Sequence, residues 1–316
     1  MLGTFIQQTV NALTIGSLYA LIALGYTMVY GVLRMINFSH AEMFMLGAYA
    51  AFFGLTLIVG QVAGAGTIAL TIVFFLAIIT VGLIGVGIEK VAYKPLRNSS
   101  RLAPMLSSLG VSLSLVTAIQ ILAGPQPIGF PSFFPSIRFE VLGATITAMQ
   151  VGILIASFIL MYGLHLIVNR SRIGVIVRAV AENRGTARLL GINVNLAISM
   201  VFFFGPLLGA AGGILYASYY GIMSPTMGAV IGLKAFTAAI LGGIGSIPGA
   251  MLGAYILAFI EVAGVSLLPI VTGGTLGTEY RDVLSFAILI LVLLVKPAGI
   301  LGETVSEESM VYKREF

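Results

Sequence analysis

The sequence contains no cysteine, no tryptophan and only two histidines, and only 9% of its 316 residues are charged. The lack of cysteine excludes disulfides and thiolate metal sites, and two histidines are too few for a histidine-rich metal site. A soluble domain keeps about a quarter of its residues charged so that its surface stays hydrated. Because 59% of this chain is hydrophobic, most of its surface must face lipid.

Several functional signatures are also missing. No G-x-x-x-x-G-K-[ST] phosphate loop occurs, so this chain is not expected to hydrolyse ATP, and no clustered acid, base or metal-ligand set suggests an enzyme. The first ten residues carry no Lys or Arg, which predicts that there is no cleavable signal peptide. The formal charge of +5 does not indicate nucleic-acid binding, because the basic residues lie in short loops between apolar runs.

Long apolar runs make up most of the chain. A membrane-spanning helix needs about 20 mostly apolar residues, and most of the runs approach that length. They are Thr9–Val32, Met43–Val59, Thr67–Ile88, Leu102–Leu122, Ile146–Val168, Leu196–Tyr220, Met227–Leu241, Ile247–Leu268 and Val283–Val295. The run Met227–Leu241 is short for a full crossing. The sequence therefore predicts an all-α integral membrane protein, a single domain over residues 1–316, with 8–9 transmembrane or re-entrant helices.

The positions of Lys and Arg predict the orientation, because short cytoplasmic loops carry an excess of both. The loops after the third and fifth runs hold nine of the 16 basic residues and are expected in the cytoplasm. These nine are Lys90, Lys94, Arg97, Arg101, Arg170, Arg172, Arg178, Arg184 and Arg188. The stretch Gly124–Phe139 has four prolines and one basic residue, Arg138, and is expected outside.

A short internal repeat predicts two structural repeats. Met45–Tyr49 and Met251–Tyr255 both read MLGAY. Each copy opens an apolar run directly after a polar or Gly/Pro-rich break, Asn37–Glu42 in one half and Gly242–Gly249 in the other. Paired interruptions of this kind indicate discontinuous helices along the substrate path of a transporter. Both a parallel and an inverted arrangement of the two repeats are compatible with the sequence.

The richest polar cluster is formed by Asn37, Ser39, His40 and Glu42. Ser39 and Glu42 have the spacing of a capping box, so one interpretation is a well-capped helix start in a cytoplasmic loop. The other interpretation places this helix start inside the membrane, with its positive dipole end aimed at an anionic group. Polar residues at membrane depth are expensive unless they are functional. The second half offers Gly245 and Ser246 as the counterpart, with Pro248 in a first helical turn.

Two sets of glycines are spaced by four residues and therefore share one helix face. Small residues at this spacing let two helices approach closely, which predicts packing rather than contact with a solute. The sets are Gly245, Gly249 and Gly253, and Gly205 and Gly209.

The segment Ser171–Val194 predicts a short amphipathic helix at the cytoplasmic membrane surface. Arg178 and Glu182 are one helical turn apart and are expected to form an ion pair. Leu189 and Leu190 precede Gly191, a residue that commonly ends a helix. The segment either caps the helix bundle or docks into a partner protein.

Acidic residues are nearly absent from the apolar runs, where Glu261 is the one carboxyl well inside a run. A proton- or sodium-coupled carrier usually has more ionisable groups at membrane depth. Few counter-charges also disfavour a dication as the solute. Apolar side chains would line the path, so the sequence predicts a zwitterionic solute with a neutral or aliphatic side chain.

Four segments carry a family resemblance: Ala12–Gly25 (ALTIGSLYALIALG), Ile36–Glu42 (INFSHAE), Leu241–Gly249 (LGGIGSIPG) and Lys296–Gly302 (KPAGILG). With Arg178–Asn183 and Leu190–Ile192, they resemble the LivH-type permease subunits of branched-chain amino acid ABC importers over about residues 5–303. The family usually reads INFAHGE at 36–42, so Ser39 and Ala41 are departures that leave the histidine and the glutamate in place. In many relatives Pro follows the Asn of the second motif, where this chain has Arg184.

The resemblance implies one permease domain with an ATPase-coupling loop at about residues 169–195 and a cytoplasmic tail at about residues 297–316. It implies a substrate path through the two breaks, at Asn37, Ser39, His40, Glu42, Gly245 and Ser246. It also implies that the coupling residues are Arg178, Ala181, Glu182, Asn183, Leu190, Gly191 and Ile192.

The resemblance further implies a multi-pass protein of the bacterial plasma (inner) membrane that works with other chains. The implied partners are a second, LivM-type permease subunit, two ATP-binding subunits, an external or periplasmic solute-binding protein and the membrane lipid. No cofactor is expected in this chain, since ATP and Mg would bind to the ATPase subunits. A urea or amide permease on the same scaffold and an ATP-independent channel are the open alternatives.

Overall fold

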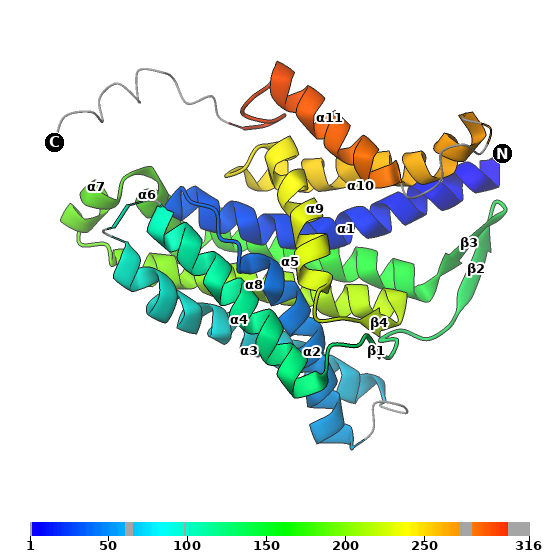
Figure 1. Ribbon diagram of the computed structural model, residues 1–316, viewed down its shortest axis with the longest axis horizontal. Helices are drawn as coiled ribbons and strands as arrows, with labels where there is room; N and C mark the ends of the chain where they lie inside the picture. The colour runs from blue at the N-terminus through cyan, green and yellow to red at the C-terminus, as the bar shows by residue number, and fades with distance from the viewer. Residues whose placement is uncertain are drawn as a thin grey trace.

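The computed structural model (Figure 1) describes residues 2–60, 66–97, 99–100, 102–271, 273 and 280–302. The long helices are α1 (Leu2–Leu33), α2 (His40–Val59), α3 (Thr67–Ile88), α4 (Leu102–Ala123), α5 (Ala148–Arg170), α8 (Val194–Tyr220), α9 (Met227–Gly242), α10 (Ile247–Val271) and α11 (Arg281–Val295). Seven helices of the described part are long and apolar enough to cross a membrane, and α9 and α11 are shorter apolar helices. The predicted all-α membrane fold is confirmed.

Shorter elements join these helices. The π-helical segment η1 (Glu89–Tyr93) and the 3-10 segment η2 (Lys94–Leu96) follow α3, and α6 (Arg172–Glu182) and α7 (Arg184–Leu189) follow α5. Two antiparallel ladders pair β1 (Ile128–Gly129) with β4 (Ile222–Met223) and β2 (Arg138–Val141) with β3 (Ala144–Thr147). The proline-rich stretch Gly124–Phe139, expected only as an external loop, thus contains short strands.

The helix α1 lies at the centre of the bundle. Every residue from Gly16 to Val29 is buried, and α1 packs against α8, α9 and α10. A helix that is apolar on all sides suits this position, because none of its faces needs water. It ends at Leu33 because Arg34 has a positive φ of 55°. The Arg184 guanidinium donates to the carbonyl of Val32 over 2.7 Å and satisfies a backbone group at this helix end.

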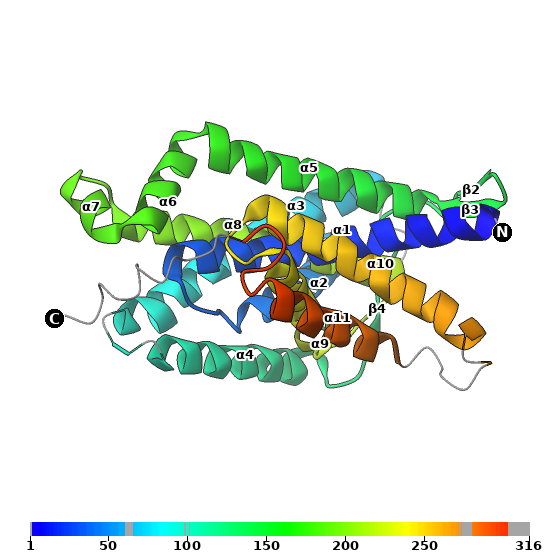
Figure 2. The same ribbon diagram turned by 90° about the horizontal axis from the view of Figure 1, so that it is seen from above.

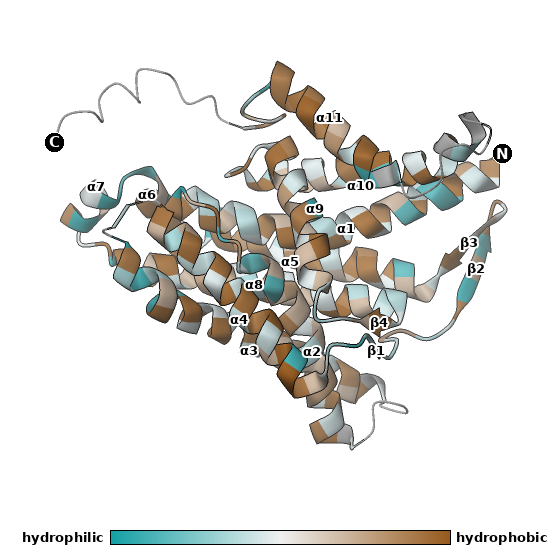
Figure 3. Cartoon of the chain, in the orientation of Figure 1, coloured by the Kyte–Doolittle hydropathy of each residue, from teal (hydrophilic) through white to brown (hydrophobic). Residues whose placement is uncertain are grey.

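The helices α3, α4 and α5 form the outside of the bundle, and Figure 2 shows α4 and α5 on opposite sides of it. The large exposed side chains of α3 are apolar and recur at helical spacing: Ile68, Ile72, Phe75, Leu76, Ile79, Leu83 and Ile84. Figure 3 shows hydrophobic colouring over most of α4 and α11 as well. These faces suit the hydrocarbon core of a bilayer. The helix α4 packs mainly on α2 and η1 and buries little of its own surface.

The two ends of the bundle differ in charge. The basic segments η1, η2, α6 and α7 gather at one end, to the left in Figure 1. At the other end the backbone N–H of Thr145 donates to Oε1 of Gln7 over 2.8 Å, which ties the β2–β3 hairpin to the start of α1. From the excess of Lys and Arg, the first end is expected in the cytoplasm and the hairpin end outside. They are called the cytoplasmic end and the outer end below.

Close helix contacts depend on small residues, as the sequence predicted. A Cβ at Gly213 of α8 would overlap the backbone of Phe44 on α2. Cβ atoms at Gly249 and Gly253 of α10 would likewise overlap the backbone of α9. The packing interpretation is therefore confirmed for these two residues but is wrong for Gly245, which precedes α10 with a φ of 102°.

Candidate functional site

The break between α1 and α2 lies inside the bundle. Nε2 of His40, the first residue of α2, is 3.3 Å from the carbonyl oxygen of Ile22. Ile22 precedes the end of α1 by eleven residues, which is about 16 Å along the helix axis. The chain therefore turns back after Arg34 and begins α2 well within the bundle. Figure 1 shows α2 running across the long axis of the bundle, as α9 also does.

All four polar residues predicted in this break are buried. Asn37 is 4% exposed, Ser39 and Glu42 are 1% exposed, and His40 is 0% exposed. A solvated loop at the membrane surface would leave such side chains open to water. The structure thus supports the deep position and not the cytoplasmic loop.

The imidazole of His40 occupies a slot formed by glycines of α1 and α8. A Cβ at Gly25 would overlap the imidazole ring. Cβ atoms at Gly205 and Gly209 would lie 3.7 and 3.6 Å from its Cε1 atom. The Tyr26 ring closes the slot edge-on, with the two ring centroids 4.7 Å apart. The Gly205–Gly209 pair therefore makes room for a side chain from the break, a role that its four-residue spacing alone could not distinguish from helix packing.

The predicted capping box is wrong. The Ser39 side chain makes no capping hydrogen bond to α2; its Oγ donates to Oδ1 of Asn37 over 2.7 Å. The Tyr93 hydroxyl donates to the same Asn37 oxygen. Oε1 of Glu42 accepts from the Ser112 hydroxyl of α4 over 3.0 Å. The buried neighbours η1 and α4 supply partners that a solvated helix start would lack, so both side chains turn away from the backbone.

Glu42 leaves one carboxylate oxygen free. Oε2 is buried and has no hydrogen-bond partner among the described residues. It lies against α9, where a Cβ at Gly228 would come within 2.5 Å of it. A buried polar atom without a partner is energetically expensive. This oxygen is therefore a candidate contact for a solute that enters between α2, α4 and α9.

The second break joins α9 to α10 and lies closer to the cytoplasmic end. Oγ of Ser246 accepts from the backbone N–H of Gly249 over 3.2 Å, and Pro248 follows in the first turn of α10, as predicted. Gly245 is exposed, and its carbonyl oxygen would lie 3.9 Å from a Cβ at Gly31. Gly31 is six residues beyond Gly25, or about 9 Å along α1. The structure therefore does not bring Gly245 and Ser246 together with Asn37–Glu42.

The segment Lys296–Gly302 braces this second break. Backbone N–H groups of Ile300 and Leu301 donate to the carbonyls of Leu241 and Gly242 over 3.0 and 2.9 Å. These are carbonyls at the end of α9, which have no partner within their own helix. The remainder of the expected tail, residues 303–316, lies outside the described residues.

The cytoplasmic segment forms two short helices rather than the single one predicted. Asn183 ends α6 and caps α7, because its Oδ1 accepts from the backbone N–H of Thr186 over 3.0 Å. Gly191 has a φ of 78°, so the predicted stop is confirmed. Leu189 and Leu190 before it are 89% and 74% exposed.

The predicted ion pair between Arg178 and Glu182 is not formed in the described part of the chain. The Arg178 guanidinium donates instead to the carbonyl of Val168 at the end of α5. Glu182, Asn183, Leu190 and Gly191 are exposed, and Ala181 and Ile192 are half-buried. Because the arginine closes the end of α5, the Glu182 carboxylate is left on the surface of the loop.

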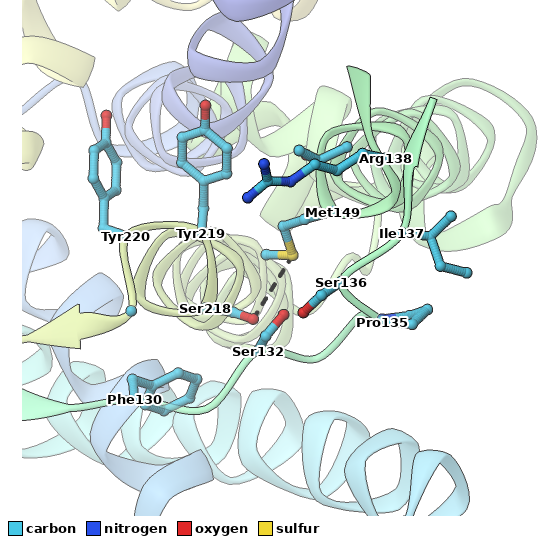
Figure 4. A pocket seen from close by; sticks show the side chains of 12 residues that line it. Phe130, Ser132, Pro135, Ser136, Ile137, Arg138, Met149, Ser218, Tyr219 and Tyr220 are labelled. Atoms are coloured by element: carbon cyan, nitrogen blue, oxygen red, sulfur yellow. Dashed lines mark hydrogen bonds between the residues drawn. The ribbon is translucent and has the colours of Figure 1, made fainter. Parts of the chain in front are cut away.

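A pocket of about 380 Å³ opens at the outer end. Figure 4 shows the Arg138 guanidinium pointing toward the ring of Tyr219, with Ser218 below them. The Ser218 hydroxyl accepts from the backbone N–H of Phe133 over 2.7 Å, which holds the proline-rich stretch over the end of α8. The lining residues are Phe130, Ser132, Pro135, Ser136, Ile137, Arg138, Thr147, Met149, Ser218, Tyr219, Tyr220 and Gly221.

Comparison with known proteins identifies the family. The family model described as "Branched-chain amino acid transport system / permease component" matches residues 8–293. The chain belongs to this family. It is 42% identical over 302 residues to the high-affinity branched-chain amino acid transport system permease protein BraD of Pseudomonas aeruginosa, which covers 94% of this chain and 96% of BraD.

Two further relatives agree with this. The chain is 43% identical to the high-affinity permease protein LivH of Escherichia coli strain K12, over 94% of this chain and 96% of LivH. It is 31% identical to the probable branched-chain amino acid transport permease protein LivH of Methanocaldococcus jannaschii, over 92% of this chain and 91% of that protein. The chain is therefore a multi-pass membrane transport subunit and not an enzyme.

This permease also contains a buried ionic cluster that the sequence analysis missed. Nζ of Lys234 on α9 lies 3.0 Å from Oε1 of Glu261 on α10 and 2.6 Å from Oδ1 of Asp282 on α11. The Tyr19 hydroxyl of α1 donates to Oε2 of Glu261 over 2.9 Å. Lys234 and Glu261 are 5% and 4% exposed. Glu261 was treated as an isolated carboxyl, although a lysine inside the apolar run Met227–Leu241 was the available signal.

We expect Lys234→Met to destabilise the protein, because it leaves the buried Glu261 carboxylate without its cation, next to the half-exposed Asp282 carboxylate. Breaking one side of a buried ion pair costs about 3–5 kcal/mol, which should lower the thermal midpoint of the detergent-solubilised protein by several degrees. The matched control is the triple variant Lys234→Met, Glu261→Gln and Asp282→Asn, which removes all three charges and should recover much of that stability. Equal midpoints for Lys234→Met and the unmodified chain would contradict this assignment.

Proposed function

We propose that this chain is the membrane-spanning permease subunit of an ATP-binding-cassette importer, and that it translocates branched-chain or other neutral amino acids delivered by an external binding protein. The observation that carries the proposal is the identity of 42–43% over 94% of the chain to permeases of high-affinity branched-chain amino acid transport systems. The buried break at Asn37–Glu42 supports it, because a polar site at membrane depth suits a transporter.

The proposed path runs along α1 and α8. It begins at the outer pocket beside Tyr220 and reaches the His40 slot at Gly209, eleven residues earlier on α8 and about 16 Å deeper. It leaves past Gly245 and Ser246, which are placed nearer to the cytoplasmic end. Asn37, Ser39, His40 and Glu42 would line its middle section. Because these four are at most 4% exposed, the structure corresponds to a closed path.

The helix α4 is the proposed cover of this middle section. Its Ser112 hydroxyl donates to Glu42, and its Ser108 Oγ accepts from the backbone N–H of Phe38 over 3.2 Å. The rest of α4 packs lightly and presents apolar side chains to lipid. A movement of α4 would make Glu42 accessible to a solute without disrupting the packing around α1.

The site chemistry favours a zwitterion. The free Oε2 of Glu42 would accept hydrogen bonds from the solute ammonium group, and the start of α2 offers partial positive charge, roughly half an elementary charge, to the carboxylate. Lys234 is paired with Glu261 and Asp282, and Glu261 also accepts from the Tyr19 hydroxyl, so neither Lys234 nor Glu261 serves as a second counter-charge. An amino acid with a neutral side chain matches this balance better than a dication or a sugar.

The repeat motifs support a fold of two structural repeats with discontinuous helices. In α2 the motif glycine Gly47 would overlap the backbone of α8 if it carried a Cβ, and in α10 the motif glycine Gly253 would overlap that of α9. Each motif thus places its glycine at a close backbone contact of a helix that follows a break. The proposed 8–9 membrane segments include α2 and α9, each of which either crosses the membrane or re-enters it.

The proposal requires partner chains. ATP and Mg would bind to two ATPase subunits that meet α6 and α7, a second permease subunit would complete the membrane part, and a binding protein would dock at the outer end. The support for the ATPase contact is local: Leu189 and Leu190 are apolar side chains exposed at the cytoplasmic end, and the exposed charged residues Glu182 and Arg188 precede them on the same segment. The bacterial plasma membrane is the proposed site of the assembly.

Uptake in vesicles that contain the chain with its ATPase, permease and binding-protein partners tests the substrate class. We expect ATP-dependent uptake of labelled leucine, with competition by isoleucine, valine and alanine. Urea and ribose at the same concentrations should not compete. Competition by urea or ribose in the absence of competition by alanine would contradict the proposal, and uptake without ATP would indicate a channel.

Cysteine accessibility tests the path, since the native chain has no cysteine. Ser39→Cys should react with a small water-soluble thiol reagent only when ATP and the loaded binding protein are present. Ser246→Cys should react from the cytoplasmic side. Ser132→Cys in the outer pocket serves as an always-reactive control, and Ser114→Cys on the exposed face of α4 should stay unreactive in lipid. Labelling of Ser39→Cys that ignores ATP would exclude a gated path.

A double variant tests the coupling loop. Glu182→Ala with Gly191→Ala removes a surface charge and strains a left-handed helix end, so we expect uptake to fall about tenfold or more while the amount of inserted protein stays unchanged. Gly60→Ala is the matched control, because Gly60 ends α2 with a similar φ of 71° and also has no atoms near its Cβ position. Normal uptake by the double variant, or an equal loss in the control, would remove the basis for the assignment.

A further inference from the structure

A second cavity lies at the cytoplasmic end, between the α3–η1–η2 segment and the start of α8. Its volume is about 520 Å³. It belongs neither to the proposed solute path nor to the coupling helices α6 and α7. Its lining is divided into a polar half and an apolar half: Val86, Glu89, Lys90, Lys94, Asn193, Asn195, Leu196, Ser199, Met200 and Phe203.

The charge of the polar half is positive. Lys90 and Lys94 are exposed, and neither has a carboxylate within 4.0 Å among the residues that the structure describes. The one carboxylate in the lining, Glu89, is already engaged: it pairs with the Arg97 guanidinium and accepts from the Ser199 hydroxyl over 2.8 Å. Two ammonium groups are therefore left to attract an anion into the cavity.

Two amide side chains add hydrogen-bond donors. Oδ1 of Asn193 accepts from the backbone N–H of Leu196 over 3.1 Å and so caps α8. Oδ1 of Asn195 accepts from the Arg97 guanidinium over 2.6 Å. With both oxygens occupied, the NH₂ groups are the hydrogen-bond donors that these two lining residues still have for a ligand. Lysine ammonium and amide NH₂ groups together suit the oxygens of a phosphate ester.

The apolar half continues from these donors into the membrane. Phe203 is eight residues beyond Asn195 on α8, about 12 Å deeper along the helix axis. Val86 and Met200 line the cavity with it. The cavity is thus polar at the membrane surface and apolar toward the hydrocarbon, which is the profile of a phospholipid. Basic pockets between transmembrane helices on the cytoplasmic side are suited to anionic headgroups.

We propose that this cavity binds one anionic phospholipid of the cytoplasmic leaflet, with its phosphate between Lys90 and Lys94 and one acyl chain along Met200 and Phe203. A free phosphate ester shares the headgroup chemistry but gains nothing from the apolar half. The lipid would fill the gap between α3 and α8 and stabilise their packing at the cytoplasmic end.

Native mass spectrometry of the full-length chain in detergent tests this proposal, with phosphatidylglycerol and phosphatidylcholine of identical acyl chains as probes. We expect retention of phosphatidylglycerol over phosphatidylcholine. Each lysine should contribute about fivefold to the affinity, so Lys90→Gln with Lys94→Gln should weaken phosphatidylglycerol binding about 30-fold. Lys296→Gln, which removes an exposed lysine outside this cavity, should leave the affinity unchanged.

Three results of this experiment would overturn the proposal. These are equal retention of the two lipids, unchanged phosphatidylglycerol binding by the double variant, and complete displacement of the lipid by millimolar glycerol phosphate, which would make the site one for soluble phosphate. If the double variant aggregates, the two single variants are measured instead, and each should bind phosphatidylglycerol about fivefold more weakly. A further test uses the assembled transporter in lipid-free detergent and a chemical acetylating reagent. If bound ATPase subunits protect Lys90 and Lys94 from this reagent, the surface belongs to a protein partner, and the proposal is overturned.

Discussion

The contact between the His40 ring and the glycines of α1 and α8 holds an interrupted helix inside a membrane protein. In hydrocarbon no water is present to satisfy backbone groups, so irregular backbone persists only where protein surrounds it. The chain meets this requirement at residues 34–39 by packing the break against α1, η1 and α4. If the imidazole could not enter between Gly25, Gly205 and Gly209, the start of α2 would be forced outward, and the polar residues that follow would face lipid.

The same constraint explains the side-chain partners around the break. Asn37 accepts from both Ser39 and Tyr93, and α4 supplies one serine to the backbone of Phe38 and another to Glu42. One oxygen of Glu42 is left over, and it faces the narrow space beside α9. Nδ1 of His40 is also buried without a hydrogen-bond partner among the described residues. Polar partners for most of the break, with these two atoms left free, are the arrangement expected of a site that holds a polar solute briefly and releases it.

Much of the fold was predictable because hydropathy reflects the surrounding lipid directly. Each of the nine apolar runs is a helix, and the two breaks occur where polar or Gly/Pro-rich residues interrupt the runs. The errors have a common physical cause. The Ser39–Glu42 spacing and the Arg178–Glu182 spacing describe one helix alone, whereas the observed partners lie outside that helix: Asn37 in the break before α2, Ser112 on α4 and Val168 on α5.

The Lys234 cluster could not be predicted for the same reason, since its members lie on different helices. One charge inside the run Met227–Leu241 barely changes its average hydropathy, and its partners lie on α10 and α11 with a further link to α1. Four helices must be placed before the pairing becomes visible. The depth of the first break was likewise open in the sequence, because contacts between distant segments place it, such as that between His40 and Ile22.

The burial of α1 has a consequence for how the protein is made. The helix α1 is synthesised before the helices that cover it and enters the bilayer without them, yet in the finished molecule its residues Gly16–Val29 are covered by α8, α9 and α10. The hydroxyls of Ser17 and Tyr19 bind to Tyr255 and Glu261, which are synthesised more than 230 residues later. The first helix must therefore remain in the membrane with these groups unpaired until the last third of the chain has been inserted, and an interrupted translation product would expose them to any quality-control protease that recognises polar groups in lipid.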